Sequence, residues 1–318
     1  MKNLLKLTSI FLLGVFMVAC SNDDDAGDVD DNQTIAEFVA DNPNYSSLAA
    51  ALEQAGLTAT LNGSASYTVF APNNAAFDAF LQANNFASLE DVPEEALRQT
   101  LLNHVLNGEL ASGDLSTGYD TTLATYSNTD NNLSIYINTS NGVELNGVST
   151  VTNADISAEN GIIHAVDAVI TLPTVVTFAT ADPTFETLVQ ALTRDDQPDF
   201  VGILSTPIPA DLPPFTVFAP TNDAFGALLT ELSVNSLADI DGGTLTATLN
   251  THVIQGANVR AEDLTTGTVL TLGANIEIDA DAATITDPNG RTSNIIVTNV
   301  QAANGVVHAI NQVLLPSL

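Results

Sequence analysis

Four histidines are the residues of this sequence best suited to chemistry, because an imidazole can transfer protons or bind a metal ion near neutral pH. They are His104, His164, His252 and His308. A closed zinc site needs four Cys, His or carboxylate ligands, and no cysteine or glutamate cluster accompanies these histidines. We therefore predict that all four are structural residues, with no metal ion and no cofactor. Helical spacing with Leu97 and Leu101, or Leu245 and Leu249, predicts that His104 and His252 face inward.

Catalytic motifs are missing from the sequence. It contains no Gly-x-Ser-x-Gly, His-Glu-x-x-His or Gly-Lys-(Ser/Thr), the motifs that mark common hydrolases and nucleotide-binding proteins. The 38 acidic residues offer many carboxylate pairs for glycoside hydrolysis, but most must be solvated surface and no pair stands out. Asp279 and Asp281 lack the Gly and Glu that complete a calcium loop. We predict that the protein is not an enzyme and that its acidic surface binds calcium weakly.

The first 19 residues have the pattern of a signal peptide. Lys2 and Lys6 precede an apolar run, residues 10–18, that is too short to span a bilayer. The run ends at the only cysteine, Cys20, and Met-Val-Ala-Cys resembles the bacterial lipobox. We expect cleavage before Cys20 and lipidation of its sulfur, which would anchor the chain to a membrane. The alternative is an ordinary signal peptide followed by an incidental cysteine.

Residues 20–33 form an acidic segment behind this cysteine. Six aspartates and almost no large apolar side chain lie between Ser21 and Gln33, so the segment cannot bury enough surface to fold. We interpret it as a solvated tether. An acidic stretch in this position also resembles the surface-export signal of Bacteroidota lipoproteins. We therefore expect a lipoprotein of the outer membrane that is exposed at the cell surface.

Composition limits the partners and the number of domains. The formal net charge is −32, which argues against nucleic acid as a partner. Charged residues make up only 14% of the chain and hydrophobic residues 45%, as a folded core requires. About 285 residues follow the tether, which is more than one core usually holds. Two domains are therefore expected.

An internal repeat confirms this division within the sequence itself. Residues 67–77 (Tyr-Thr-Val-Phe-Ala-Pro-Asn-Asn-Ala-Ala-Phe) match residues 215–225 at eight of eleven positions. Downstream, Asn-Gly-Ile-Ile-His-Ala-Val at 160–166 matches Asn-Gly-Val-Val-His-Ala-Ile at 304–310. We predict a first domain at 34–173 and a second at 174–318, with almost no linker between them, so that their relative orientation is restrained.

Helices are expected in the first half of each copy. Asn42-Pro43 and Asp182-Pro183 are good helix starts, since Asn and Asp cap helices and Pro suits the first turn. The Thr-Val-Phe strands at 68–70 and 216–218 end at a proline, after which Asn73 or Asn74, and Thr221 or Asn222, can cap a further helix. The second half of each copy alternates apolar and polar residues between turns, which predicts antiparallel strands. The fold class is therefore α+β.

These motifs resemble the fasciclin (FAS1) domain, and the resemblance covers residues 34–318 twice over. It implies a wedge of about seven strands packed with several helices, in secreted or membrane-tethered proteins of cell adhesion. Similarity to the family also suggests that Asn74 is the hydrogen-bond partner of His104 and that Asn222 is that of His252. Many members carry Tyr before the central histidine, where this chain has other residues, so a role of that tyrosine cannot be transferred.

Two functions of different class remain open from the sequence. The first is a surface lipoprotein that mediates adhesion or binds matrix or biofilm components, with a protein or polysaccharide ligand. The alternative is an enzyme or accessory protein that acts on an extracellular polymer.

Overall fold

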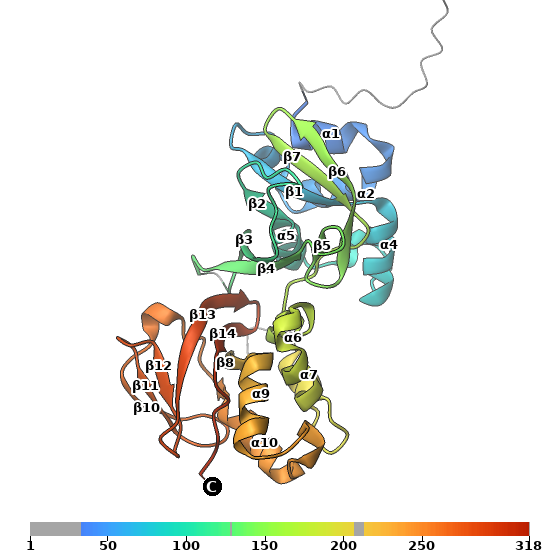
Figure 1. Ribbon diagram of the computed structural model, residues 1–318. Coiled ribbons are helices and arrows are strands. Elements are labelled where there is room, and N and C mark those ends of the chain that lie inside the picture. The colour runs from blue at the N-terminus through green and yellow to red at the C-terminus, as the bar shows by residue number, and fades with distance from the viewer. Residues whose placement is uncertain (1–32, 128, 207–212, 318) are drawn as a thin grey trace, which may run out of the picture.

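The computed structural model describes residues 33–127, 129–206 and 213–317 (Figure 1). The predicted signal peptide, the lipidated Cys20 and the tether up to residue 32 lie outside the described residues. Within these ranges, no helix combines the length and the apolar character that crossing a bilayer requires.

The described elements repeat in the same order in the two halves of the chain. The first domain contains α1 (Ile35–Asp41), η1 (Pro43–Tyr45), α2 (Ser46–Gln54), α3 (Thr58–Leu61), β1 (Tyr67–Pro72), α4 (Asn74–Ala83), η2 (Leu89–Asp91), α5 (Glu94–Leu102), β2 (Val105–Asn107), β3 (Gly118–Thr125), β4 (Asn132–Asn138), β5 (Glu144–Leu145), β6 (Ser149–Ala158) and β7 (Gly161–Val166). The second contains α6 (Val175–Ala181), η3 (Pro183–Phe185), α7 (Glu186–Leu192), α8 (Phe200–Leu204), β8 (Phe215–Pro220), α9 (Asn222–Glu231), η4 (Leu237–Asp239), α10 (Gly242–Thr251), β9 (Val253–Gln255), η5 (Ala261–Asp263), β10 (Gly267–Val269), β11 (Ile276–Asp279), β12 (Thr284–Thr286), β13 (Thr292–Ala302) and β14 (Gly305–Ile310).

Polar caps fix where the helices begin. Thr34 and Thr174 are the N-caps of α1 and α6, and each hydroxyl accepts a 3.3 Å hydrogen bond from the backbone N–H three residues on. This bond satisfies one of the N–H groups that a helix start leaves without a partner. Of the alternative caps that the sequence offers for α4 and α9, the structure uses Asn73 and Thr221.

The predicted Asn-Pro and Asp-Pro helix starts are confirmed as short 3-10 turns. Asn42 caps η1 and Asp182 caps η3, and in each case the side-chain oxygen accepts from the backbone N–H two residues on. The α-helices α2 and α7 follow directly and turn their leucines into the core.

Among the described residues, seven strands form the sheet of each domain. In the first domain they close into a barrel in the order β1 to β7, and in the second they form a sheet in the order β10-β11-β12-β13-β14-β8-β9. Most neighbours are antiparallel, as the sequence predicts, but β1 pairs with β7 in parallel and β8 pairs with β14 in parallel. The strands of the second half of each copy, β3 to β7 and β10 to β14, pair with one another in antiparallel fashion, which confirms the expectation for that half. The parallel pairs join this half to the strand of the first half, a pairing that the alternation of apolar residues does not reveal. The α+β fold class is confirmed.

Each domain has its own core, and one aromatic residue of the first domain joins the core of the second. Phe77 and Phe225 are buried by α4 and α9 at matching places in the two main cores. Tyr136 of β4 packs with the second domain's core. The Ser134 hydroxyl also accepts a 3.0 Å hydrogen bond from the backbone N–H of Gln301 in β13. Figure 1 shows β4 facing β13 and α6 across this boundary.

Candidate functional site

The two central histidines, His104 and His252, are buried at the carboxyl ends of α5 and α10. Each is 2% exposed. Nδ1 of His104 donates to the Thr100 carbonyl at 2.7 Å, one turn earlier, and Nε2 accepts from the backbone N–H of Ile170 at 2.8 Å. Burial lowers the pKa of His104 to about 4, an effect only partly offset by the carbonyl. The imidazole is therefore neutral and satisfied on both sides.

His252 repeats this arrangement in the second domain. Its Nδ1 donates to the Thr248 carbonyl at 2.8 Å and its Nε2 accepts from the backbone N–H of Leu314 at 2.9 Å. Burial again lowers the pKa to about 4. Each ring thus ties a helix end to the segment that follows the last strand of its domain.

The predicted asparagine partners of these histidines were wrong. Asn74 is hydrogen-bonded to the Pro43 carbonyl at 2.9 Å and to the backbone N–H of Ser47 at 2.9 Å. Asn222 bonds the Pro183 carbonyl at 2.8 Å in the same way. Both amides connect the first turn of α4 or α9 to the start of the helix beside it. The imidazoles are instead satisfied by backbone groups, which no sequence motif marks.

The strand histidines, His164 and His308, are also buried, at 0% exposure. Their Nε2 atoms each lie 2.9 Å from a backbone carbonyl, of Leu110 and Val259. Nδ1 accepts a backbone N–H from the bulged strand beside it, at 3.2 Å for His164 and 3.4 Å for His308. Burial lowers the pKa of His308, the Val259 carbonyl opposing it. The prediction that His104 and His252 face inward is confirmed, and His164 and His308 are buried as well.

Asn160 and Asn304 are structural residues whose role the sequence reasoning missed. Asn160 is 4% exposed, accepts from the backbone N–H of Ile35 at 2.9 Å and donates to the carbonyls of Leu61 and Gly63, both at 2.8 Å. Asn304 makes the equivalent bonds in the second domain. Their place at the start of both Asn-Gly-x-x-His motifs was the available signal.

The buried histidines therefore offer no site for a substrate. Their nitrogens are engaged by backbone groups and their rings are covered. In the part of the chain that the structure describes, no group of three or more His, Cys, Asp or Glu side chains could hold a metal ion. Another molecule can therefore bind only at the surface of the protein or in a cleft.

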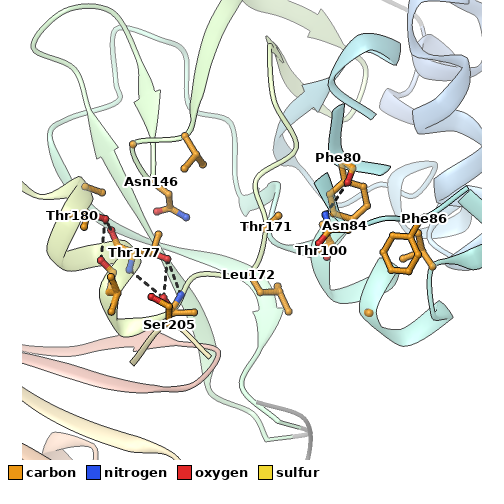
Figure 2. A pocket seen from close by; sticks show the side chains of 17 residues that line it. Phe80, Asn84, Phe86, Thr100, Asn146, Thr171, Leu172, Thr177, Thr180 and Ser205 are labelled. Atoms are coloured by element: carbon orange, nitrogen blue, oxygen red, sulfur yellow. Dashed lines mark hydrogen bonds between the residues drawn. The ribbon is translucent and has the colours of Figure 1, made fainter. Parts of the chain in front are cut away.

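One such feature is a cleft of about 640 Å³ between the two domains. The first domain contributes α4, α5, the loop after α4 and the β5–β6 turn to its walls, and the second domain contributes α6 and the end of α8 (Figure 2). The segment between β7 and α6, residues 167–174, which we call the connector, completes the lining. We call this feature the interdomain cleft. Its lining residues are Phe80, Asn84, Phe86, Val92, Ala96, Thr100, Asn146, Gly147, Val148, Thr171, Leu172, Thr174, Val176, Thr177, Thr180, Ala181 and Ser205.

The two copies of the fold both match one known protein family. The family profile described as Fasciclin domain matches residues 43–173 and again residues 183–316, which together are most of the chain. The chain belongs to the fasciclin family.

Relatives of these fasciclin domains occur in animals and bacteria. The chain is 29% identical to human periostin over 263 residues, which are 80% of this chain and 29% of periostin. It is 35% identical to protein sll1483 of Synechocystis over 177 residues, which are 54% of this chain and 90% of that protein. The chain thus spans under a third of periostin's length but most of the cyanobacterial protein's.

Among solved structures, the chain is similar to the FAS1 domain pair of the insect cell adhesion molecule Fasciclin I. The match has a TM-score of 0.45 and 20% identity, and covers 84% of this chain and 92% of the other. Fasciclin domains are linked to cell adhesion.

Proposed function

We propose that this protein is a cell-surface lipoprotein that mediates adhesion or binds components of an extracellular matrix or biofilm through its fasciclin domains. The observation that carries the proposal is the pair of fasciclin domains behind an amino-terminal segment with a lipobox-like Cys20. A doubly acylated cysteine holds a protein stably on a membrane, since each buried methylene contributes about 0.8 kcal/mol.

The buried histidines support a binding role over a catalytic one. A general acid or base must come within hydrogen-bond reach of its substrate. His104 and His252 are covered and already bonded to the protein's own backbone. The exterior is left to make contacts, and its carboxylates give it a strong negative charge.

The proposal is tested in the source cells with three strains: wild type, a gene deletion and Cys20→Ser. We expect the deletion to reduce attachment to matrix-coated surfaces, and Cys20→Ser to release the protein from the membrane fraction and reduce attachment equally. Protease treatment of intact wild-type cells reports surface exposure. Unchanged attachment in the deletion strain would contradict the adhesive function, and membrane retention of Cys20→Ser would contradict the lipid anchor.

A further inference from the structure

The interdomain cleft is uncharged in a strongly acidic protein. The chain carries a formal net charge of −32, yet none of the 17 residues that line the cleft is Asp, Glu, Lys, Arg or His. Its volume of about 640 Å³ is typical of ligand sites. A charged ligand would find no opposite charge there, and the surrounding carboxylates repel anions. The cleft therefore suits a neutral ligand.

Asn146 gives the cleft a hydrogen-bond donor without a partner. This residue in the β5–β6 turn is 2% exposed, and its Oδ1 accepts a 2.7 Å bond from the backbone N–H of Tyr136, which fixes the orientation of the amide. Its Nδ2 is buried and has no hydrogen-bond partner among the described residues. Figure 2 shows this nitrogen turned toward the cleft. A buried donor without a partner is unfavourable, so a ligand that brings an acceptor oxygen is favoured.

The wall formed by the first domain adds aromatic surface. Phe80 and Phe86 are half buried and their ring centroids lie 6.5 Å apart. Thr171 of the connector and Ser205 at the end of α8 also line the cleft and carry hydroxyl groups. A sugar ring presents an apolar C–H face, which packs on aromatic rings, together with hydroxyl and ether oxygens, which bond to amides. The cleft contains both kinds of partner.

A polypeptide ligand fits the cleft less well. Peptides in an extended conformation commonly bind by adding a strand to an exposed sheet edge. No lining residue of the cleft lies within a β-strand, since all belong to helices, their ends, the α4–η2 loop, the β5–β6 turn or the connector. The backbone hydrogen bonds that hold an added strand are therefore not offered.

We propose that the interdomain cleft binds an uncharged oligosaccharide segment. A sugar ring packs on Phe80 and Phe86, and a sugar oxygen accepts from Nδ2 of Asn146. The inference rests on the proposed adhesive function for its biological setting and names the ligand class of that function. Both domains contribute to the wall, so the pair, rather than one domain, is the binding unit.

The test is isothermal titration calorimetry of the full-length chain, purified in mild detergent. The probes are four neutral hexasaccharides (cellohexaose, laminarihexaose, mannohexaose and maltohexaose), hexagalacturonic acid and an uncharged (Ser-Thr)5 peptide. We expect at least one neutral hexasaccharide to bind with 1:1 stoichiometry, and the acidic sugar and the peptide not to bind. The proposal is overturned if no neutral sugar binds, or if the acid or the peptide binds instead.

Three variants place the binding in the cleft. Asn146→Asp keeps the acceptor for Tyr136 and suits the backbone φ of 52°, but replaces the donor by a carboxylate, and we expect affinity to fall about tenfold or more. Val148→Asp puts a charge on a lining residue that is 54% exposed, and should also weaken binding without affecting folding. Asn235→Asp makes the same charge change at an exposed position outside the lining and should have no effect.

The variants separate the two proposals. Sugar binding that is unchanged in both Asn146→Asp and Val148→Asp would place the ligand elsewhere and overturn the inference. If Asn146→Asp is unfolded by thermal melting, Val148→Asp decides alone. Cells that lose attachment on gene deletion while the purified protein binds no neutral sugar would retain the adhesive function and reject the cleft as its site.

Discussion

The hydroxyl of Tyr119 in the first domain donates a 3.0 Å hydrogen bond to Oδ2 of Asp182 in the second. The other oxygen of this carboxylate caps η3 by accepting from the backbone N–H of Thr184 at 2.9 Å. Asp182 thus begins a helix and joins the two domains. Among the described residues, the side chain of Asn42, the equivalent residue of the first domain, makes the capping bond to Asn44 and no bond to the other domain.

Burial, together with the nearby Asp182 carboxylate, raises the pKa values of Tyr119 and Tyr136. The pKa of Tyr136 rises to about 12. Both phenols remain protonated donors at neutral pH. The Tyr119 ring also packs edge-on against Phe178, with centroids 5.5 Å apart, so the boundary has an aromatic contact as well as a polar one.

Tyr119→Phe should lower the free energy of unfolding by about 2 kcal/mol, because a hydrogen bond to a charged, largely buried carboxylate is lost. Chemical denaturation measures the change. Tyr67→Phe is the matched control, since Tyr67 is half buried in β1 and its hydroxyl has no hydrogen bond among the described residues. Equal losses in the two variants would show that the bond across the boundary does not stabilise the pair.

His104→Ala should destabilise the protein by about 2–4 kcal/mol, because it leaves a cavity and an unpaired backbone N–H at Ile170. His252→Ala should cost a similar amount in the second domain. Thermal melts followed by circular dichroism measure both. His104→Gln offers an acceptor at the far end of the side chain and should cost less than alanine, whereas a melt of His104→Ala that matches the wild type would refute the structural role.

The buried histidines also predict a loss of stability in acid. The pKa values of His104 and His252 fall from 6.5 to about 4 on folding, so between these pH values the unfolded chain binds more protons than the folded chain. Their effect is absent above pH 6.5 and grows as the pH falls, reaching about 3 kcal/mol per histidine near pH 4. Denaturation at several pH values measures the slope.

The variant His104→Gln isolates this pH effect from that of the carboxylates. Its stability should depend less steeply on pH between 6.5 and 4 than that of the wild type, since one titrating group is gone. Parallel pH profiles of the two proteins would mean that His104 is not the source of the slope.

Gly161→Ala should cost more than about 3 kcal/mol or prevent folding. At this residue φ is +150°, and a Cβ would lie 1.9 Å from the carbonyl oxygen of Tyr67, in the strand that pairs with β7. Neither backbone can move without breaking the parallel pair. Gly113→Ala is the control, because a Cβ there meets no atom within 4 Å and φ is ordinary. Similar melting temperatures for the two variants would contradict the close approach.

Individual residues show which features of the fold and of the histidine sites could be predicted from the sequence. The caps Asn42 and Asp182 were predicted because capping is local, within three residues of the helix start. The inward position of His104 and His252 followed from helical spacing. The partner of His104 could not follow, since Ile170 lies 66 residues away and a backbone N–H carries no residue-specific signal. The Asn74 pairing failed for that reason.

The sequence by itself determined the repeat, the two domains' common fold, the helix starts at Asn42 and Asp182 and the burial of His104 and His252, because caps and periodicity act over one or two turns. Tertiary structure decided that β1 pairs in parallel with β7, which backbone groups satisfy each imidazole, and that the domains meet around Asp182 and enclose an uncharged cleft. Periodicity specifies which side of an element is buried, whereas the surface that covers it comes from residues far along the chain.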